Sequence, residues 1–274
     1  REIIAENNVS LIISDNRYGL YSEKIYSIII THQVSPVLPF VFGPAEYPLY
    51  LVIRRMIGRF DECWIPDFEG RENVSGQLSH RYKTPHNARF IGLLSRFHLS
   101  AKAPSFPDNT NYKLVIVLSG PQPALRRITF RLIKQARELQ IKTLVAGGLQ
   151  DDLSFNGGDS NVTFKKHVPA DELYHLLRNA EFIVCRAGYS SLMDLVAINR
   201  TALIIPTSGQ TEQEYLARYH HSKGTFYAVN ESVVDLKRDL YIMESKKGRP
   251  ALNNLSAQVS LDTLIQHVYD SHYR

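Results

Sequence analysis

The sequence contains few cysteines: Cys63 and Cys185 are the only two in 274 residues. Each lies inside an apolar, strand-like segment, which favours two reduced, buried thiols over a disulfide framework and is typical of a cytosolic protein. Metal-binding pairs such as CxxC or HExxH are absent, so the residues support no zinc site. We therefore expect neither a metal nor another cofactor.

Long apolar runs are also missing. No stretch approaches the roughly 18 residues that a membrane-spanning helix needs, and no secretory leader is recognised. Hydrophobic residues make up 44% and charged residues 22%, a balance that argues against disorder. The formal charge of +5 suits an anionic ligand or an acidic membrane surface and does not decide between them. Basic and aromatic residues do not interleave, so we predict no nucleic-acid partner.

The first part of the chain has short apolar runs joined by long segments that contain proline and glycine. Strands are expected at 11–13, 27–31, 62–65 and 89–91, and a helix at 48–60. Residues 1–6 look like the end of a helix without an initiator methionine, so we expect a fragment whose first domain is incomplete. We assign residues 1–98 to this partial domain. Residues 99–111, dense in proline and small polar residues, are assigned to a linker.

The second part, residues 112–274, alternates strands and helices. Strands are expected at 113–118, 141–146, 161–168, 182–185 and 202–205. Helices are expected at 124–139, 170–179, 190–198, 211–221, 232–244 and 260–269. Continuous apolar strands that alternate with helices predict a doubly wound α/β domain with a parallel sheet covered on both faces. Ligands of such sheets bind beyond the carboxyl ends of the strands.

The turn from Arg186 to Ser191 combines a cation, a glycine and two hydroxyls at the start of a helix. Helix N-termini have unsatisfied N–H groups and a partial positive charge, so they bind anions. Gly188 allows close approach of a ligand to the backbone, and Arg186 adds a fork of donors. Asp194 would repel phosphate, so a ribose diol suits it better. The pattern predicts a nucleotide diphosphate site; a capped helix with a solvated arginine is the structural alternative.

Two other strand exits are weaker signals. Ser119 and Gly120 follow a buried strand, where such a pair is a common turn even without a ligand. In the segment 206–215, the side chains of Gln213 and Glu214 could hydrogen-bond sugar hydroxyls. The same segment is also typical of a helix-capping sequence. All three exits would form one cleft if they meet at a single sheet edge.

The segments 186–197, 202–206 and 210–217 together resemble the C-terminal domain of glycosyltransferase family 28, which has members in bacterial cell-envelope synthesis. The likeness covers the chain from about residue 112. It implies a GT-B fold: two doubly wound domains with a nucleotide-sugar between them, and metal-independent transfer that inverts the anomeric carbon. The donor implied is UDP-linked. Residues 1–98 would then form the acceptor-side domain.

The resemblance also implies roles for individual residues. Ser119 and Gly120 approach the pyrophosphate, His167 and Val168 flank the base, and Arg186, Gly188, Tyr189, Ser190 and Ser191 line the phosphates. Asp194 holds the ribose, and Gly209, Gln210, Glu212, Gln213 and Glu214 face the donor sugar. The family often carries two glutamines where this chain has Gln213 and Glu214, which leaves the identity of the sugar open.

Catalytic groups are harder to find in the first part. Asp15 and His32 follow predicted strands, and each could accept a proton from an attacking hydroxyl. A hydrogen-bonded turn at Asp15 and a strand-end histidine are the structural alternatives. The family's glycine-rich N-terminal loop has no match here. Two further functions therefore stay open: a nucleotide-sugar epimerase or hydrolase of the same fold, and a non-catalytic nucleotide-sugar-binding protein.

The helix predicted at 48–60 is apolar apart from Arg54, Arg55 and Arg59. Such a helix could lie on an anionic leaflet, or it could pack in the protein while its arginines extend to water. We expect a cytoplasmic protein with peripheral contact at the inner face of the membrane. Its partners would be the nucleotide-sugar and an unknown, lipid-linked hydroxyl acceptor.

Overall fold

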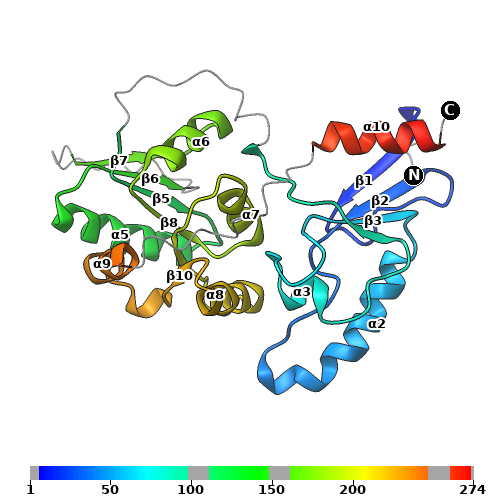
Figure 1. Ribbon diagram of the computed structural model, residues 1–274, viewed down its shortest axis with the longest axis horizontal. Helices are drawn as coiled ribbons and strands as arrows, with labels where there is room; N and C mark the ends of the chain where they lie inside the picture. The colour runs from blue at the N-terminus through cyan, green and yellow to red at the C-terminus, as the bar shows by residue number, and fades with distance from the viewer. Residues whose placement is uncertain (1–5, 98–110, 148–160, 246–259, 273–274) are drawn as a thin grey trace. The chain divides into compact units, whose positions relative to one another are not determined.

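The computed structural model describes residues 6–97, 111–147, 161–245 and 260–272 (Figure 1). The chain divides into two compact units, Arg1–Leu94 with Ala257–Arg274, and Ser95–Ser256. The predicted second domain ran to residue 274, whereas the structure groups the last segment with the first unit. The predicted linker lies outside the described residues, apart from Asn111.

The first unit contains a parallel sheet of four strands in the order β1-β2-β3-β4. The strands are β1 (Leu11–Asp15), β2 (Tyr26–Ile30), β3 (Glu62–Ile65) and β4 (Ala88–Phe90). Alternate residues face opposite layers of core. Ile28, Ile30 and Trp64 belong to one cluster, and Ile29 and Cys63 belong to the other.

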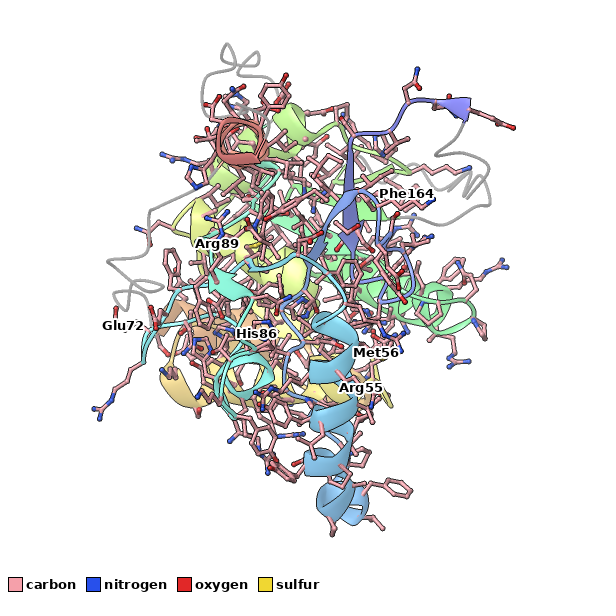
Figure 2. All side chains as sticks on the ribbon, turned by 90° about the vertical axis from the view of Figure 1, so that its right-hand side faces the viewer. Arg55, Met56, Glu72, His86, Arg89 and Phe164 are labelled. Atoms are coloured by element: carbon pink, nitrogen blue, oxygen red, sulfur yellow. The ribbon has the colours of Figure 1, made fainter. Side chains whose placement is uncertain are left out.

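Among the described residues of this unit, the helical segments are η1 (Phe40–Ala45), α2 (Glu46–Ile57), α3 (Gln77–His80) and α10 (Leu261–His272). Leu264 and Val268 of α10 pack in the cluster that contains Trp64. This packing explains why the end of the chain belongs to the first unit. The predicted helix at 48–60 corresponds to α2; Arg55 and Met56 lie in its last turn (Figure 2), while η1 and α3 were not predicted.

The second unit contains a parallel sheet of six strands in the order β10-β9-β8-β5-β6-β7. Its strands are β5 (Leu114–Leu118), β6 (Thr143–Gly147), β7 (Val162–Lys165), β8 (Phe182–Arg186), β9 (Leu203–Ile205) and β10 (Tyr227–Ala228). From β5 the chain proceeds outward to β6 and β7, and then returns to place β8 on the other side of β5. The strand order therefore reverses between β5 and β8.

Helices cover both faces of this sheet (Figure 1). They are α5 (Ala124–Leu139), α6 (Ala170–Asn179), α7 (Tyr189–Ala197), α8 (Thr211–Lys223) and α9 (Leu236–Ser245), with the 3₁₀ turn η3 (Glu231–Val233) before α9. Helices α5 and α9 share a core with Ile116 and Val184. Leucines of α6 and α7 line a small hollow with Val117 and Ile183, which point to the opposite face. The predicted doubly wound architecture is confirmed.

The prediction of two reduced, buried thiols is also confirmed. Cys63 and Cys185 are free and buried, and burial raises the pKa of each thiol to about 12. Among the described helices, none is long and apolar enough to cross a membrane. The edge strand β10 was missed because its two residues are too few to show a periodic pattern.

Candidate functional site

The three unusual strand exits lie on adjacent strands. Strands β9, β8 and β5 are neighbours in the second sheet and are parallel, so their carboxyl ends meet at one edge. The reversal of strand order between β5 and β8 marks the position where ligands of open α/β sheets bind. The exits Ser119-Gly120, 186–191 and 206–213 therefore meet the condition stated for a single cleft, which is that they lie at one sheet edge.

Gly120 brings the turn after β5 close to the loop after β9. It has a φ of +140°, a backbone conformation that residues other than glycine rarely adopt. A Cβ added to Gly120 would lie 3.8 Å from Oγ1 of Thr207. Thr207 is only 3% exposed, and its hydroxyl has no hydrogen-bond partner among the described residues. Thr207 was not predicted as a site residue, although it directly follows one of the three exits.

Helix α7 begins at the centre of this edge, with Gly188 as its N-cap. Gly188 has an ordinary φ of −74° and ψ of 141°, and a Cβ added there would meet nothing within 4 Å. The fold itself therefore does not require glycine at this position, and the space in front of it is open. Ser190 is exposed and Ser191 is half-buried, beside first-turn N–H groups that lack helical partners. Tyr189, in contrast, is buried.

Arg186 ends β8 and is almost completely buried. Strand alternation places it on the same face as Val184, toward α5 and α9. Its Nη1 donates to Oε2 of Glu231 at 2.8 Å and has a long contact of 3.5 Å to the carbonyl oxygen of Ile205. Nε and Nη2 have no partner within the described structure. The alternative of a solvated arginine is wrong, and its guanidinium does not open directly to solvent.

Asp194 is buried one turn further along α7 and is held by two residues at the start of the second unit. Its Oδ1 accepts a hydrogen bond from Ser95 Oγ at 2.6 Å, and its Oδ2 accepts one from Arg96 Nε at 2.6 Å. The side chain of Arg96 is 50% exposed and borders a small hollow with Ser191 and Asp194. Arg96, which was not predicted, is thus an accessible cation beside α7.

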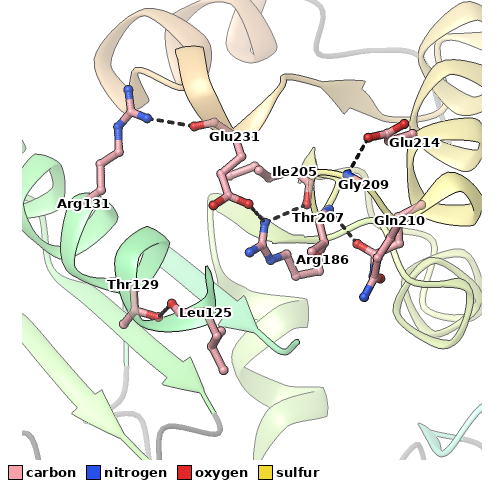
Figure 3. A network of polar contacts seen from close by, with 11 residues as sticks. Leu125, Thr129, Arg131, Arg186, Ile205, Thr207, Gly209, Gln210, Glu214 and Glu231 are labelled. Atoms are coloured by element: carbon pink, nitrogen blue, oxygen red, sulfur yellow. Dashed lines mark hydrogen bonds and ion pairs between the residues drawn. The ribbon is translucent and has the colours of Figure 1, made fainter. Parts of the chain in front are cut away.

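The predicted sugar-binding residues form a hydrogen-bonded loop between β9 and α8 (Figure 3). Oε1 of Gln213 accepts from the backbone N–H of Thr207 at 2.9 Å, and its Nε2 donates to Gln210 at 2.6 Å. Oε1 of Glu214 accepts from the N–H of Gly209 at 2.9 Å. These contacts tie the first turn of α8 to the loop that precedes it, whereas the N-cap Gln210 makes no side-chain capping hydrogen bond, so the structure does not show the capping sequence that was the alternative. Glu212 lies in the same first turn of α8.

The predicted base-binding pair is further along the sheet. His167 and Val168 follow the edge strand β7, two strands from β5. His167 is exposed, whereas Val168 is buried. The structure thus places this pair at the same sheet edge as the glycine turns but not beside α7.

Asp15 and His32 belong to the first unit, where Asp15 is the last residue of β1 and His32 follows the carboxyl end of the neighbouring strand β2. Asp15 pairs with Ile30 in the parallel register, and His32 lies two residues beyond. The N–H of Asn16 donates to the carbonyl of Ile30 at 2.9 Å, and Thr31 Oγ1 donates to Asn16 Oδ1 at 2.9 Å. A hydrogen-bonded turn is therefore present next to Asp15, and the catalytic role stays a prediction.

Two sequence comparisons identify relatives of this chain. Residues 117–267 match the family model of the glycosyltransferase family 28 C-terminal domain. One curated relative is the UDP-N-acetylglucosamine–N-acetylmuramyl-(pentapeptide) pyrophosphoryl-undecaprenol N-acetylglucosamine transferase of Caldanaerobacter subterraneus subsp. tengcongensis. It is 29% identical over 150 residues, which are 52% of this chain and 41% of that protein. The match thus spans about two-fifths of the relative's length.

Solved structures resemble both units. The spinosyn rhamnosyltransferase SpnG in complex with thymidine diphosphate has a TM-score of 0.64 at 12% identity, covering 97% of this chain and 75% of that one. A putative UDP-N-acetylglucosamine 2-epimerase from Listeria monocytogenes has a TM-score of 0.63 at 13% identity, covering 100% of this chain and 76% of that one. MurG from Acinetobacter baumannii has a TM-score of 0.55 at 11% identity, covering 98% of this chain and 77% of that one. At these identities the likeness establishes the fold, which is GT-B.

Proposed function

Because the chain belongs to glycosyltransferase family 28, we propose that it transfers a sugar from a nucleotide-sugar to a hydroxyl acceptor. The single observation that carries this proposal is the open space at Gly188. A glycine that the backbone does not need, at a helix N-terminus on the reversal point of the sheet, leaves room for an anion against the first-turn N–H groups.

The chemistry of the surrounding residues supports a diphosphate at this position. The half-exposed guanidinium of Arg96, whose Nε is paired with Asp194, borders the same hollow as Ser191 and brings further N–H donors to it. Buried donors on Arg186 and Thr207 lack acceptors among the residues that the structure describes, and leaving such a donor unsatisfied costs about 1–3 kcal/mol of stability. Phosphate oxygens bound at the carboxyl edge of the sheet would supply acceptors for these donors.

In the proposed reaction the acceptor oxygen attacks the anomeric carbon as the bond to the diphosphate oxygen breaks. Attack from the opposite face inverts the configuration. The N-terminus of α7 and Arg96 stabilise the negative charge that develops on the departing diphosphate. Asp15 or His32 accepts the proton of the acceptor hydroxyl. No metal or cofactor takes part in this proposal.

The donor we propose is UDP-linked and the acceptor lipid-linked, as in the name of the curated relative. The alternative is an epimerase or hydrolase, an activity named for one structural neighbour. Isothermal titration calorimetry with UDP, followed by incubation with UDP-sugars with and without a polyprenyl-linked acceptor, tests these functions. Acceptor-dependent UDP release supports transfer, whereas isomerised or free sugar without acceptor supports the alternative. Absence of any UDP binding would reject the site.

We also propose peripheral contact with an anionic membrane through the surface formed by η1 and the outer face of α2. Exposed apolar residues occupy it: Val41 is 81%, Phe42 62%, Tyr47 55% and Val52 54% exposed. Apolar side chains dominate the start of this surface, and Arg54 and Arg55 follow in the last turn of α2; Arg55 is labelled in Figure 2. If the exposed apolar side chains of η1 and the start of α2 insert into the membrane, the arginines reach the level of the lipid phosphates. Each arginine would then contribute about 1 kcal/mol to the free energy of membrane binding.

Sedimentation with phosphatidylglycerol vesicles tests this contact. We expect the wild type to sediment with these vesicles and Phe42→Ser to stay in solution. Neutral phosphatidylcholine vesicles should bind less, because the arginines then lack an anionic partner. Self-association through the same surface, detected by light scattering with no vesicle binding, would contradict the proposal.

A further inference from the structure

Glu231 supplies the counter-charge of Arg186. The Arg186 side chain is 1% exposed and the Glu231 side chain 16%, with 2.8 Å between Nη1 and Oε2. A buried guanidinium without a carboxylate would be costly, so this pair fixes the rotamer of Arg186. The contact uses only Nη1. Nε and Nη2, which share the opposite edge of the guanidinium, are left without acceptors in the described structure.

That free edge is a fork of two parallel donors, the geometry that binds two oxygens of a phosphate. Arg186 pairs with Ile205 in the sheet register, and Thr207 with its unsatisfied hydroxyl follows two residues later. Thr207 in turn lies next to the Gly120 turn. Three donors that have no acceptor in the described part of the chain, Nε and Nη2 of Arg186 and the hydroxyl of Thr207, are thus buried at the edge where the diphosphate is proposed. Because they are closed to solvent, an anion reaches them only if neighbouring atoms shift.

Glu231 is itself held through its backbone by α5 (Figure 3). Arg131 Nη1 donates to the carbonyl of Glu231 at 2.8 Å, and its Nη2 donates to the carbonyl of Ser232 at 3.0 Å. One turn later, Gln135 Nε2 donates to the carbonyl of Val234 at 3.0 Å. These hydrogen bonds fix the backbone of η3 against helix α5, and this fixed backbone holds the Glu231 carboxylate in position.

We propose that Glu231 is a positioning residue: clamped by Arg131 on α5, it holds Arg186 so that the Nε and Nη2 fork takes phosphate oxygens of the donor. This inference rests on the proposed function. Because Glu231 already fixes the Arg186 side chain, this side chain loses less rotamer freedom when the diphosphate binds. The Glu231 carboxylate also partly balances the charge of the Arg186 guanidinium while no ligand is bound.

The test is a double-mutant cycle measured as the Kd for UDP in calorimetry. Glu231→Ala should weaken UDP binding about tenfold, and Glu231→Gln, whose amide oxygen still accepts from Nη1, should restore it to within about threefold of wild type. In an Arg186→Ala background, Glu231→Ala should have no further effect, because the two residues act as one unit. A residue with a merely structural role would weaken binding equally in both backgrounds.

A second pair of variants avoids a buried, unpaired charge. Arg131→Gln removes the clamp from an exposed position and should weaken UDP binding about threefold. Arg127→Gln, one turn earlier on the same helix and exposed, is the matched control and should bind as wild type. If the wild type binds UDP but neither Glu231→Ala nor Arg131→Gln changes the Kd, Glu231 has no positioning role. If the wild type does not bind UDP, the proposed function fails, and this inference fails with it.

Discussion

Replacing Gly188 by alanine tests whether glycine at this position serves ligand binding or folding stability. The N-cap backbone of Gly188, with φ −74° and ψ 141°, suits any residue, and the added Cβ would meet nothing within 4 Å. Alanine also restricts the unfolded chain, which stabilises a compatible site by about 0.4–1 kcal/mol. Because alanine is less favourable than glycine at an N-cap by a similar amount, the two effects offset each other and the folded protein should be about as stable as the wild type.

UDP binding, in contrast, should be weakened. The new methyl group lies where phosphate oxygens would approach the first-turn N–H groups of α7, so those charge-assisted hydrogen bonds lengthen or break. Hydrogen bonds to charged groups contribute about 1.5–3 kcal/mol, so Gly188→Ala should weaken UDP binding about 10- to 150-fold. The assay is calorimetric titration with UDP, paired with thermal unfolding of the same sample.

Gly19→Ala is the matched control. Gly19 is also surrounded by empty space and also has no positive φ, but it belongs to the first unit. Gly19→Ala should leave the UDP affinity unchanged and should alter stability by no more than about 1 kcal/mol. The reasoning would be refuted if Gly188→Ala bound UDP as tightly as the wild type, or if its lost affinity came with an equal loss of stability.

Three further predictions concern other parts of the structure. Gly120→Ala forces a side chain into φ +140° and should lower the free energy of unfolding by about 1–3 kcal/mol in denaturant titration; an unchanged midpoint would contradict the strained turn. Asp194→Ala should weaken UDP binding about tenfold, whereas an unchanged Kd would assign the carboxylate only to anchoring Arg96. Because burial raises the pKa of Cys63 and Cys185 to about 12, a thiol reagent at pH 8 should modify neither until the protein unfolds, and rapid labelling of the native state would refute their burial.

The doubly wound sheets could be predicted because each buried strand is a continuous apolar run bounded by turn residues. The same property hides which face a strand residue points to. In β8 both faces are covered by helices, so apolar residues on either side of Arg186 do not reveal its direction. The sequence therefore indicated an arginine at the phosphate turn, whereas the structure buries it toward α5 and α9.

Partners distant in sequence were also beyond prediction. Glu231 lies 45 residues from Arg186, and Ser95 lies 99 residues from Asp194. Neither contact leaves a periodic or local signal. Helix α10 illustrates the same limit on a larger scale: its apolar stripe predicts that it packs, but not that it packs on the sheet of the first unit. Only the chain path places these residues together.

The most direct test of the account is a crystal structure of the protein with UDP. We predict diphosphate oxygens within hydrogen-bond distance of the backbone N–H groups at the start of α7, next to Gly188, with Arg96 or the fork of Arg186 as a further donor. UDP bound elsewhere, for example in the polar groove lined by Arg218 and His221, with the start of α7 empty at saturating ligand, would contradict the account.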